Sequence, residues 1–136
     1  DKNIYANLAR YVSHKSQNDN IFDKIDTSKL NEYLDGLLSG LTAKMFRTYN
    51  SCALFQKALV RGKTIEDYLT ANSKVARLCN HKCKNKFNLM TSRSNYLDPR
   101  ITVAFCEKNK IPINRVFPPN LLKKHKWALG EKYFKF

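Results

Sequence analysis

Residues 91–105 read TSRSNYLDPRITVAF, and the second half of this stretch has the signature of a helix start. Asp98 suits the N-cap because its carboxylate can accept the unpaired backbone N–H groups of a first turn. Pro99 suits the first helical position because it has no N–H group to leave unpaired. Tyr96 lies at the end of the polar run before this helix, where its hydroxyl could point outward. Apolar residues then recur at helical spacing and are expected to face a core: Ile101, Ala104 and Phe105.

Helical periodicity also dominates the chain before this stretch. Apolar residues recur every third or fourth position over residues 5–12 and again over residues 30–41. Thr27 or Ser28 can cap the second of these helices, and Thr42 can cap a third that runs to about residue 60. We therefore expect the first part of the chain to consist of helices.

Two further helices are expected. Thr64 and Asp67 have the spacing of a capping box, in which each residue satisfies a backbone N–H group beside the other. The inward face of this helix is predicted to hold Ile65, Tyr68, Leu69, Val75, Ala76 and Cys79. After a loop at residues 111–120, residues 121–130 are expected to form a short final helix. No segment alternates as a strand would, so the predicted class is all-α, a compact multi-helix domain whose core includes Tyr11, Tyr33 and Tyr49.

Composition excludes several classes of protein. The chain has 136 residues, of which 43% are hydrophobic, with four glycines and four prolines, so it is not typical of disordered or fibrous proteins. No apolar run approaches the ~20 residues that a membrane span needs, so no membrane association is expected. Nothing indicates secretion, so the four cysteines are expected to be reduced thiols.

Positive charge is concentrated after the first forty residues. The net charge is +14; residues 1–40 carry 5 basic and 6 acidic residues, residues 41–96 carry 11 and 2, and residues 97–136 carry 9 and 3. This excess favours a polyanionic partner, nucleic acid first. An anionic membrane surface is less favoured because no clear amphipathic helix with Lys and Trp accompanies the charge.

Three residues in the basic part could do chemistry together: Arg47, His81 and Tyr96. Taken singly, each has an ordinary structural interpretation, as a solvent-facing arginine, a histidine at a helix end and a half-buried tyrosine.

The segment CNHKC offers a different site, with Cys79, His81 and Cys83 as zinc ligands and Cys106 or His125 as a fourth. Zinc sites usually have paired ligands at recurring spacing, and the second pair is missing here. No glycine-rich phosphate loop is present either. We therefore expect no metal.

Four segments carry a resemblance to a known family: LTAKMFRTYN (41–50), RLCNH (77–81), SRSNYLDPRITVAF (92–105) and KWALGEKYFKF (126–136). In this order they resemble the C-terminal catalytic region of eukaryotic-type DNA topoisomerase I, the type IB family. The resemblance extends from about residue 21 to the end of the chain. It implies the C-terminal part of the catalytic fold that type IB topoisomerases and tyrosine recombinases have in common.

The resemblance implies a role for each of the three residues. Tyr96 matches the nucleophile, which cleaves one strand of double-stranded DNA and forms a 3′-phosphotyrosine, so that supercoils relax before religation without ATP, metal or another cofactor. Arg47 matches an arginine that would bind both non-bridging oxygens of the phosphate, a bidentate contact that lysine makes poorly. His81 matches a histidine that would donate a hydrogen bond to one of the same oxygens.

Basic residues near these three are expected to contact the DNA backbone without reading its sequence: Lys44, Lys82, Lys84, Lys86 and Arg93. Asn95, next to Tyr96, is expected to bind DNA facing the cleavage site. Asn95 is also where we expect poisons of the camptothecin type to bind. The resemblance further implies a nuclear enzyme.

The family places a long charged linker between the histidine and tyrosine segments, whereas here only the 14 residues 82–95 separate them. We therefore expect residues 1–81 to form a helical part of the catalytic domain. Residues 82–95 are then a short basic linker, and residues 96–136 a C-terminal domain with the nucleophile. Because the family's linker damps strand rotation, a short one predicts faster, less processive relaxation and weaker sensitivity to poisons.

A further arginine and a lysine general acid of the family belong to the segment upstream of this chain. The chain alone is therefore expected to cleave DNA poorly and to need the remainder of the same enzyme.

Two other functions stay open. A tyrosine recombinase normally has an arginine three residues after its histidine, and Lys84 occupies that position here. A catalytically inactive, basic helical DNA-binding module would use the charge without the chemistry.

Overall fold

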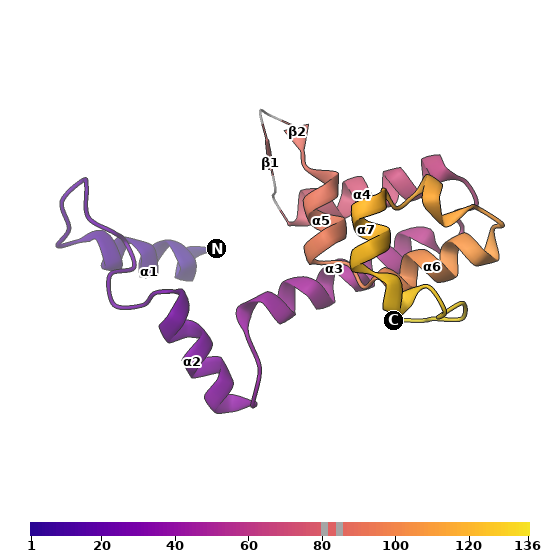
Figure 1. Ribbon diagram of the computed structural model, residues 1–136. Coiled ribbons are helices and arrows are strands. Elements are labelled where there is room, and N and C mark those ends of the chain that lie inside the picture. Colours follow the sequence, from indigo (N-terminus) through magenta and orange to yellow (C-terminus); the bar gives the residue numbers. More distant parts are fainter. Residues whose placement is uncertain (80–81, 84–85) are drawn as a thin grey trace. The chain divides into compact units, whose positions relative to one another are not determined.

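A computed structural model describes the chain except for residues 80–81 and 84–85, and gives only the backbone of residues 82–83 and 86–87 (Figure 1). Its helices and strands, in chain order, are α1 (Lys2–Val12), α2 (Thr27–Leu37), α3 (Ala43–Leu59), α4 (Ile65–Leu78), β1 (Lys82–Cys83), β2 (Lys86–Phe87), α5 (Leu89–Asn95), α6 (Pro99–Lys108), a 3-10 turn at Ile113–Arg115, α7 (Pro119–Lys124) and a second 3-10 turn at Lys126–Ala128. The predicted all-α class is confirmed, since the described residues add only one pair of two-residue strands. No helix among the described residues is long and apolar enough to cross a membrane.

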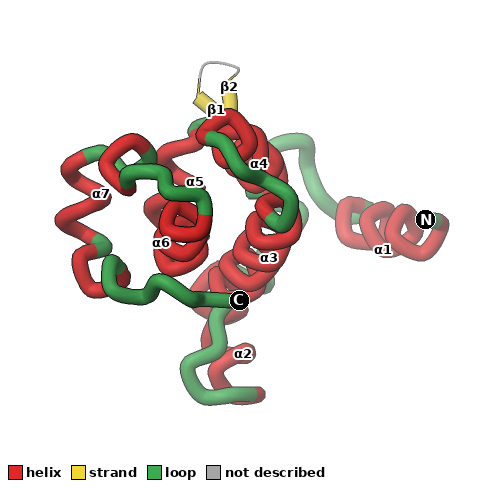
Figure 2. Tube along the Cα trace, turned by 90° about the vertical axis from the view of Figure 1, so that its right-hand side faces the viewer, coloured by secondary structure: helices red, strands yellow, loops and turns green. Residues whose placement is uncertain are grey.

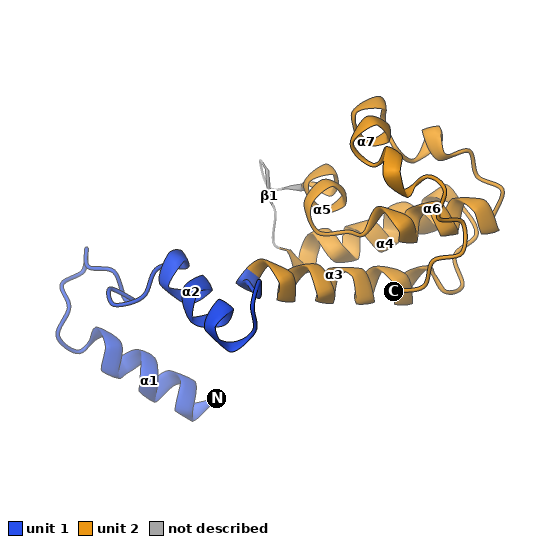
Figure 3. Cartoon of the chain, turned by 60° about the horizontal axis from the view of Figure 1, so that its bottom comes forward, with its two compact units in different colours: residues 1–43 blue, residues 44–136 orange. Residues whose placement is uncertain are grey.

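The chain divides into two compact units, residues 1–43 and residues 44–136 (Figure 3). The boundaries expected from the sequence, at residues 81/82 and 95/96, both lie inside the second unit. The segment with Tyr96 packs against helices that precede the expected linker, so it does not form a unit of its own.

Unit 1, residues 1–43, contains α1 and α2. The predicted second helix begins close to the expected position, but Asp26 is the cap, because its side chain accepts from the Lys29 N–H group. The helix ends at Leu37, before the expected residue 41. Gly40 follows with a φ of +80°, a conformation that glycine adopts without steric cost, and its N–H group donates to Asp35.

Unit 1 has no buried residue. Tyr11 and Tyr33, which the sequence placed in the core, are 45% and 65% exposed, and Tyr11 packs only edge-on against Phe22. Large apolar side chains that share this exposure are Ile4, Tyr5, Ile25, Leu37 and Leu38. The core prediction was therefore wrong for this part of the chain, because its apolar faces meet no second layer.

Unit 2, residues 44–136, has its core around α6, which lies between α7 on one side and α3 and α4 on the other (Figure 2). The predicted start of α6 is confirmed, with the Asp98 side chain as cap and Pro99 in the first turn. The predicted capping box of Thr64 and Asp67 at the start of α4 is also confirmed. Most of α6 is buried: Pro99, Ile101, Thr102, Val103, Phe105 and Cys106.

The second half of the expected linker is a helix, α5, which packs against α4. The Ser92 hydroxyl donates to the Asn72 side chain over 2.9 Å, and the Asn72 amide donates to the Leu89 carbonyl over 3.2 Å. Ser92 and Asn72 are fully buried, so both polar groups satisfy each other inside the core. The polar composition of residues 88–95 did not indicate a helix, because the buried hydrogen bonds that attach α5 to α4 cannot be recognised in the sequence.

Candidate active site

Arg47 and Tyr96 meet in unit 2. Arg47 lies in the second turn of α3, and Tyr96 is the C-cap of α5. The Nη1 atom of Arg47 donates to the Tyr96 hydroxyl over 3.4 Å, and the guanidinium carbon is 5.5 Å from the centre of the tyrosine ring. The structure therefore brings together two of the three residues that the sequence proposed for catalysis. His81 lies outside the described residues.

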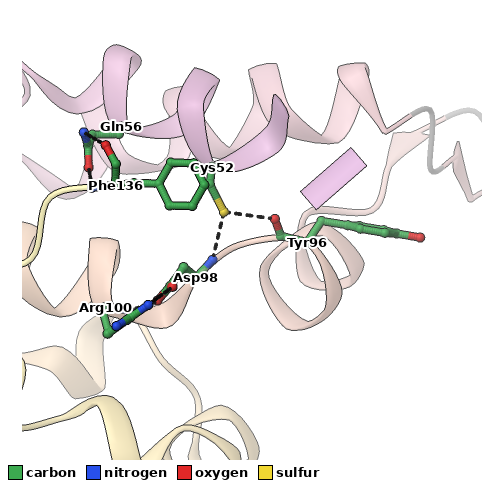
Figure 4. Close-up of polar contacts among 6 residues, drawn as sticks. All are labelled: Cys52, Gln56, Tyr96, Asp98, Arg100 and Phe136. Carbon is green, nitrogen blue, oxygen red and sulfur yellow. Dashed lines mark hydrogen bonds and ion pairs between the residues drawn. The ribbon is translucent and has the colours of Figure 1, made fainter. Parts of the chain in front are cut away.

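The backbone at Tyr96 is held from both sides of the residue. Its N–H group donates to the Ser92 carbonyl over 3.0 Å, which closes the last turn of α5. Its carbonyl accepts from the Cys52 thiol at 3.5 Å, and the same sulfur accepts from the Asp98 N–H group at 3.2 Å. Figure 4 shows both contacts, with the tyrosine ring extending away from the sulfur. Sequence reasoning placed Tyr96 correctly just before the start of α6, but it missed the helix α5 that precedes Tyr96. It also missed Cys52, which gave no signal beyond its apolar helical spacing.

The start of α6 is fixed by Asp98 and Arg100. The Asp98 carboxylate accepts from the Arg100 N–H group at 2.9 Å and from Nη2 of Arg100 at 2.7 Å. The Arg100 guanidinium stacks 4.0 Å from the Phe134 ring centre, with Trp127 at 5.8 Å. Burial by itself would raise the pKa of Asp98, but the hydrogen bonds and charge of Arg100 outweigh it, so the pKa of Asp98 is lowered.

The C-terminal tail is attached to α3. The Gln56 amide nitrogen donates to the Phe136 carbonyl over 2.9 Å, and the Phe136 N–H group donates to the Gln56 oxygen, as Figure 4 shows. The Phe136 ring lies 5.7 Å from that of Tyr49, centre to centre. Tyr49 is 64% exposed. The sequence predicted it as a core residue, and this prediction was wrong, because Tyr49 contacts the tail on the surface.

The predicted DNA-contacting residues fall into three groups. Lys44 and Asn95 are exposed in unit 2, and the Asn95 amide donates to the Thr91 carbonyl of its own helix. Arg93 points inward: its Nη1 donates to the Val116 carbonyl over 2.9 Å, and its Nε is buried. This arginine attaches α5 to the loop before α7, so the structure gives it a role inside the protein.

The remaining predicted residues lie between α4 and α5. Lys84 is outside the described residues, and Lys82 and Lys86 are described by their backbone alone, in β1 and β2.

The described residues contain no group of three His, Cys, Asp or Glu side chains that could hold a metal ion. Cys79 is buried with its sulfur 3.3 Å from the Ser51 hydroxyl, and Cys106 is buried in α6. His125 is buried against Phe117, and burial lowers its pKa. Cys52, Cys79 and Cys106 are free thiols, as expected. His81 and the Cys83 side chain are outside the described part.

Almost all of the positive charge belongs to the unit that contains Arg47 and Tyr96. Residues 44–136 carry 20 basic and 5 acidic residues, whereas residues 1–43 carry 5 and 6. The site therefore lies in a strongly electropositive unit, where a phosphate group would be attracted.

These features define a class, an all-α, strongly basic unit with an arginine and a tyrosine paired at a helix junction. Comparison with known proteins is consistent with that class. The family described as eukaryotic DNA topoisomerase I, catalytic core, matches residues 1–110. The chain therefore belongs to the eukaryotic DNA topoisomerase I catalytic-core family.

Individual relatives match nearly the whole chain. It is 30% identical to DNA topoisomerase 1 of Drosophila melanogaster and 28% identical to that of Caenorhabditis elegans, over 95% of the chain but 20% and 25% of those proteins. The human DNA topoisomerase 1 is 26% identical over 95% of the chain and 28% of its own length. The chain thus spans about a quarter of these relatives. The alignments extend over 199 to 213 residues, so the relatives contain additional residues within the matched stretch.

Proposed function

We propose that this chain is the C-terminal catalytic part of a type IB DNA topoisomerase, with Tyr96 as nucleophile and Arg47 as the residue that stabilises the transition state. The observation that supports this most directly is the 3.4 Å contact between the Arg47 guanidinium and the Tyr96 hydroxyl. A cation at that place would neutralise charge where a phosphate oxygen gains it.

The proposed step transfers a phosphoryl group from one alcohol to another. The Tyr96 oxygen bonds to phosphorus and loses its proton to solvent, while the bond from phosphorus to the 5′-oxygen breaks. The 5′-oxygen leaves with a proton from a general acid, and the 3′-phosphate stays on the tyrosine. Religation reverses each transfer, so neither ATP nor a cofactor is needed. Arg47 would bind two non-bridging oxygens through its planar fork, and His81 would donate to one of them.

Double-stranded DNA is the proposed substrate. The charge of unit 2, with 20 basic and 5 acidic residues, supports a polyanion, and this electrostatic attraction is independent of sequence. Lys44 and Asn95 are exposed, on α3 and α5, close in sequence to Arg47 and Tyr96 respectively. Lys82, Lys84 and Lys86 would add contacts from the segment between α4 and α5. Arg93 is left out because its guanidinium is engaged with Val116.

The remainder of the same enzyme is the proposed partner. It would supply the second arginine and the lysine general acid, which have no match among these residues. The exposed apolar side chains of unit 1 support a protein partner for that unit, because large apolar groups are normally covered. We also propose a nuclear location, although the similar human protein DNA topoisomerase I, mitochondrial, makes the mitochondrion the alternative that imaging of a tagged protein would test.

A covalent-trapping experiment tests the proposal. Full-length protein is incubated with a labelled duplex whose cleaved end diffuses away, and the adduct is resolved in detergent gels. We expect wild type to form an adduct at the 3′-phosphate and Tyr96→Phe to form none while binding the duplex equally well. If neither protein forms an adduct, a DNA-binding module is favoured. An adduct of equal yield in both proteins would contradict Tyr96 as the nucleophile. Strand exchange restricted to one DNA sequence would favour a recombinase.

The chain by itself provides a second test. Residues 1–136 without the upstream part should relax a supercoiled plasmid poorly or not at all, because the general acid is missing. Efficient relaxation by this polypeptide would contradict the assignment of missing groups to an upstream segment.

We further propose that the short stretch between α4 and Tyr96 acts as the family's linker in reduced form. Insertion of a long charged linker between residues 83 and 86 should slow relaxation and raise its processivity and sensitivity to camptothecin. Asn95→Ala should weaken trapping by camptothecin, because this exposed side chain lies next to the nucleophile. Unchanged relaxation after the insertion would contradict the linker proposal.

A further inference from the structure

Helix α3 contacts Tyr96 through two of its residues, Arg47 and Cys52. Arg47 contacts the hydroxyl at the end of the side chain, and Cys52 contacts the main-chain carbonyl. Cys52 lies five positions after Arg47, which is about 7.5 Å along a helix axis. Helix α3 therefore contacts both ends of Tyr96, the main-chain carbonyl through Cys52 and the hydroxyl through Arg47.

The Cys52 sulfur is suited to this attachment. It is fully buried, and burial raises the pKa of its thiol, so the S–H group stays protonated at neutral pH. The S–H group can then donate to the Tyr96 carbonyl at 3.5 Å while the sulfur accepts from the Asp98 N–H group at 3.2 Å. One side chain thus holds the backbone on both sides of Leu97, which is itself buried.

We propose that Cys52 is a positioning residue for the nucleophile: its thiol fixes the Tyr96–Asp98 backbone on α3 and so keeps the Tyr96 hydroxyl within reach of Arg47. This inference rests on the proposed function of Tyr96. A small displacement of a nucleophile has large kinetic consequences, since a misplacement of about 1 Å can reduce a rate about 100-fold.

Cys106 provides a matched control. It is 2% exposed against 0% for Cys52, and both thiols lie in the same core. Burial raises the pKa of Cys106 to about 11, yet its sulfur makes no hydrogen bond to another residue in the described part of the chain. Replacing either cysteine by alanine removes a buried sulfur, but only Cys52→Ala removes contacts to the segment with the nucleophile.

The test uses full-length protein with the variants Cys52→Ala, Cys52→Ser and Cys106→Ala. Single-turnover cleavage of a labelled duplex, the Kd for that duplex and the Tm are measured for each. We expect Cys52→Ala to cleave about 10-fold more slowly or worse, with an unchanged Kd. Cys52→Ser, which keeps a donor and an acceptor, should largely restore cleavage even where its Tm is low. Cys106→Ala should lower the Tm and leave the cleavage rate unchanged.

The proposal is overturned if Cys52→Ala cleaves as fast as wild type, if serine fails to restore the rate, or if Cys106→Ala slows cleavage equally. A measurement on the DNA-free protein separates a failure of the Cys52 proposal from a failure of the proposed function. Nuclear Overhauser contacts between the Tyr96 ring and the Arg47 side chain should be present in wild type and weakened in Cys52→Ala. If wild type forms no adduct with DNA, the proposed function fails, and these contacts still decide whether Cys52 positions Tyr96.

Discussion

Arg47 and Tyr96 lie 3.4 Å apart, from guanidinium nitrogen to phenol oxygen, although 49 positions separate them in the chain. One belongs to α3 and the other to the end of α5, and they meet because α3 and the segment Tyr96–Leu97 pack on the same core of unit 2. The pair depends on the tertiary structure, so its chemistry should be sensitive both to the two side chains and to the contacts that hold α5 and α6 in place.

Substitution of Arg47 tests its proposed role in the transition state. Arg47→Ala should lower the single-turnover cleavage rate about 100- to 1,000-fold, the usual cost of one lost donor to a developing oxyanion. Arg47→Lys should recover only part of this, because an ammonium group cannot bind two oxygens as a fork does. Lys57→Ala, an exposed basic residue of the same helix, is the control and should leave the rate close to that of wild type. A full rate in Arg47→Ala would contradict the assigned role.

Asp98 should stabilise the protein in a pH-dependent way. Its pKa is lowered in the folded state, so its contribution is present above the unfolded pKa of about 3.9 and is lost as the pH falls through the folded value. Asp98→Asn keeps a cap acceptor but loses the charge, whereas Asp98→Ala loses both and should cost about 1 kcal/mol or more at neutral pH. Urea unfolding of wild type and Asp98→Asn should therefore show a difference that shrinks in acid. A difference independent of pH would contradict this assignment.

Tyr68 should make stability fall in alkali. It is 1% exposed, its hydroxyl lies 3.2 Å from that of Thr102, and burial raises its pKa to about 12. A raised folded pKa means that its stabilisation is complete below the unfolded value near 10 and is lost as the pH rises toward about 12. Tyr68→Phe should lower the free energy of unfolding by about 1–2 kcal/mol at neutral pH. The deficit should narrow as the pH rises from 10 to about 12, because the variant has no hydroxyl to ionise.

The tail contact of Gln56 should stabilise unit 2. Gln56→Ala removes both hydrogen bonds to Phe136 and should cost about 1–2 kcal/mol in urea unfolding. Amide hydrogen exchange of residues 131–136 should become faster in this variant, while exchange in α4 stays slow. Unchanged exchange in the tail would show that the aromatic contacts of Tyr49 and Phe134 suffice to hold it.

Local signals predicted the starts of α4 and α6 accurately. Asp98 with Pro99, and Thr64 with Asp67, were identified from the sequence because a cap depends on atoms within one helical turn. The helix α5 was missed because its attachment is made by Ser92 and Asn72, which are 20 positions apart. Polar residues of this kind are typical of loops until a partner buries them.

The sequence by itself determined the all-α class, the caps of α4 and α6, the placement of Tyr96 just before α6 and the family to which the chain belongs. These follow from short-range periodicity and from motifs of adjacent residues. Only the tertiary structure decided that Arg47 meets Tyr96, that Arg93 turns inward to Val116, that Tyr49 contacts the tail and that Cys52 contacts the backbone of Tyr96. The physical reason is that a side chain's partner depends on how helices pack across a shared core, and residues distant in the sequence become neighbours only when that core is buried.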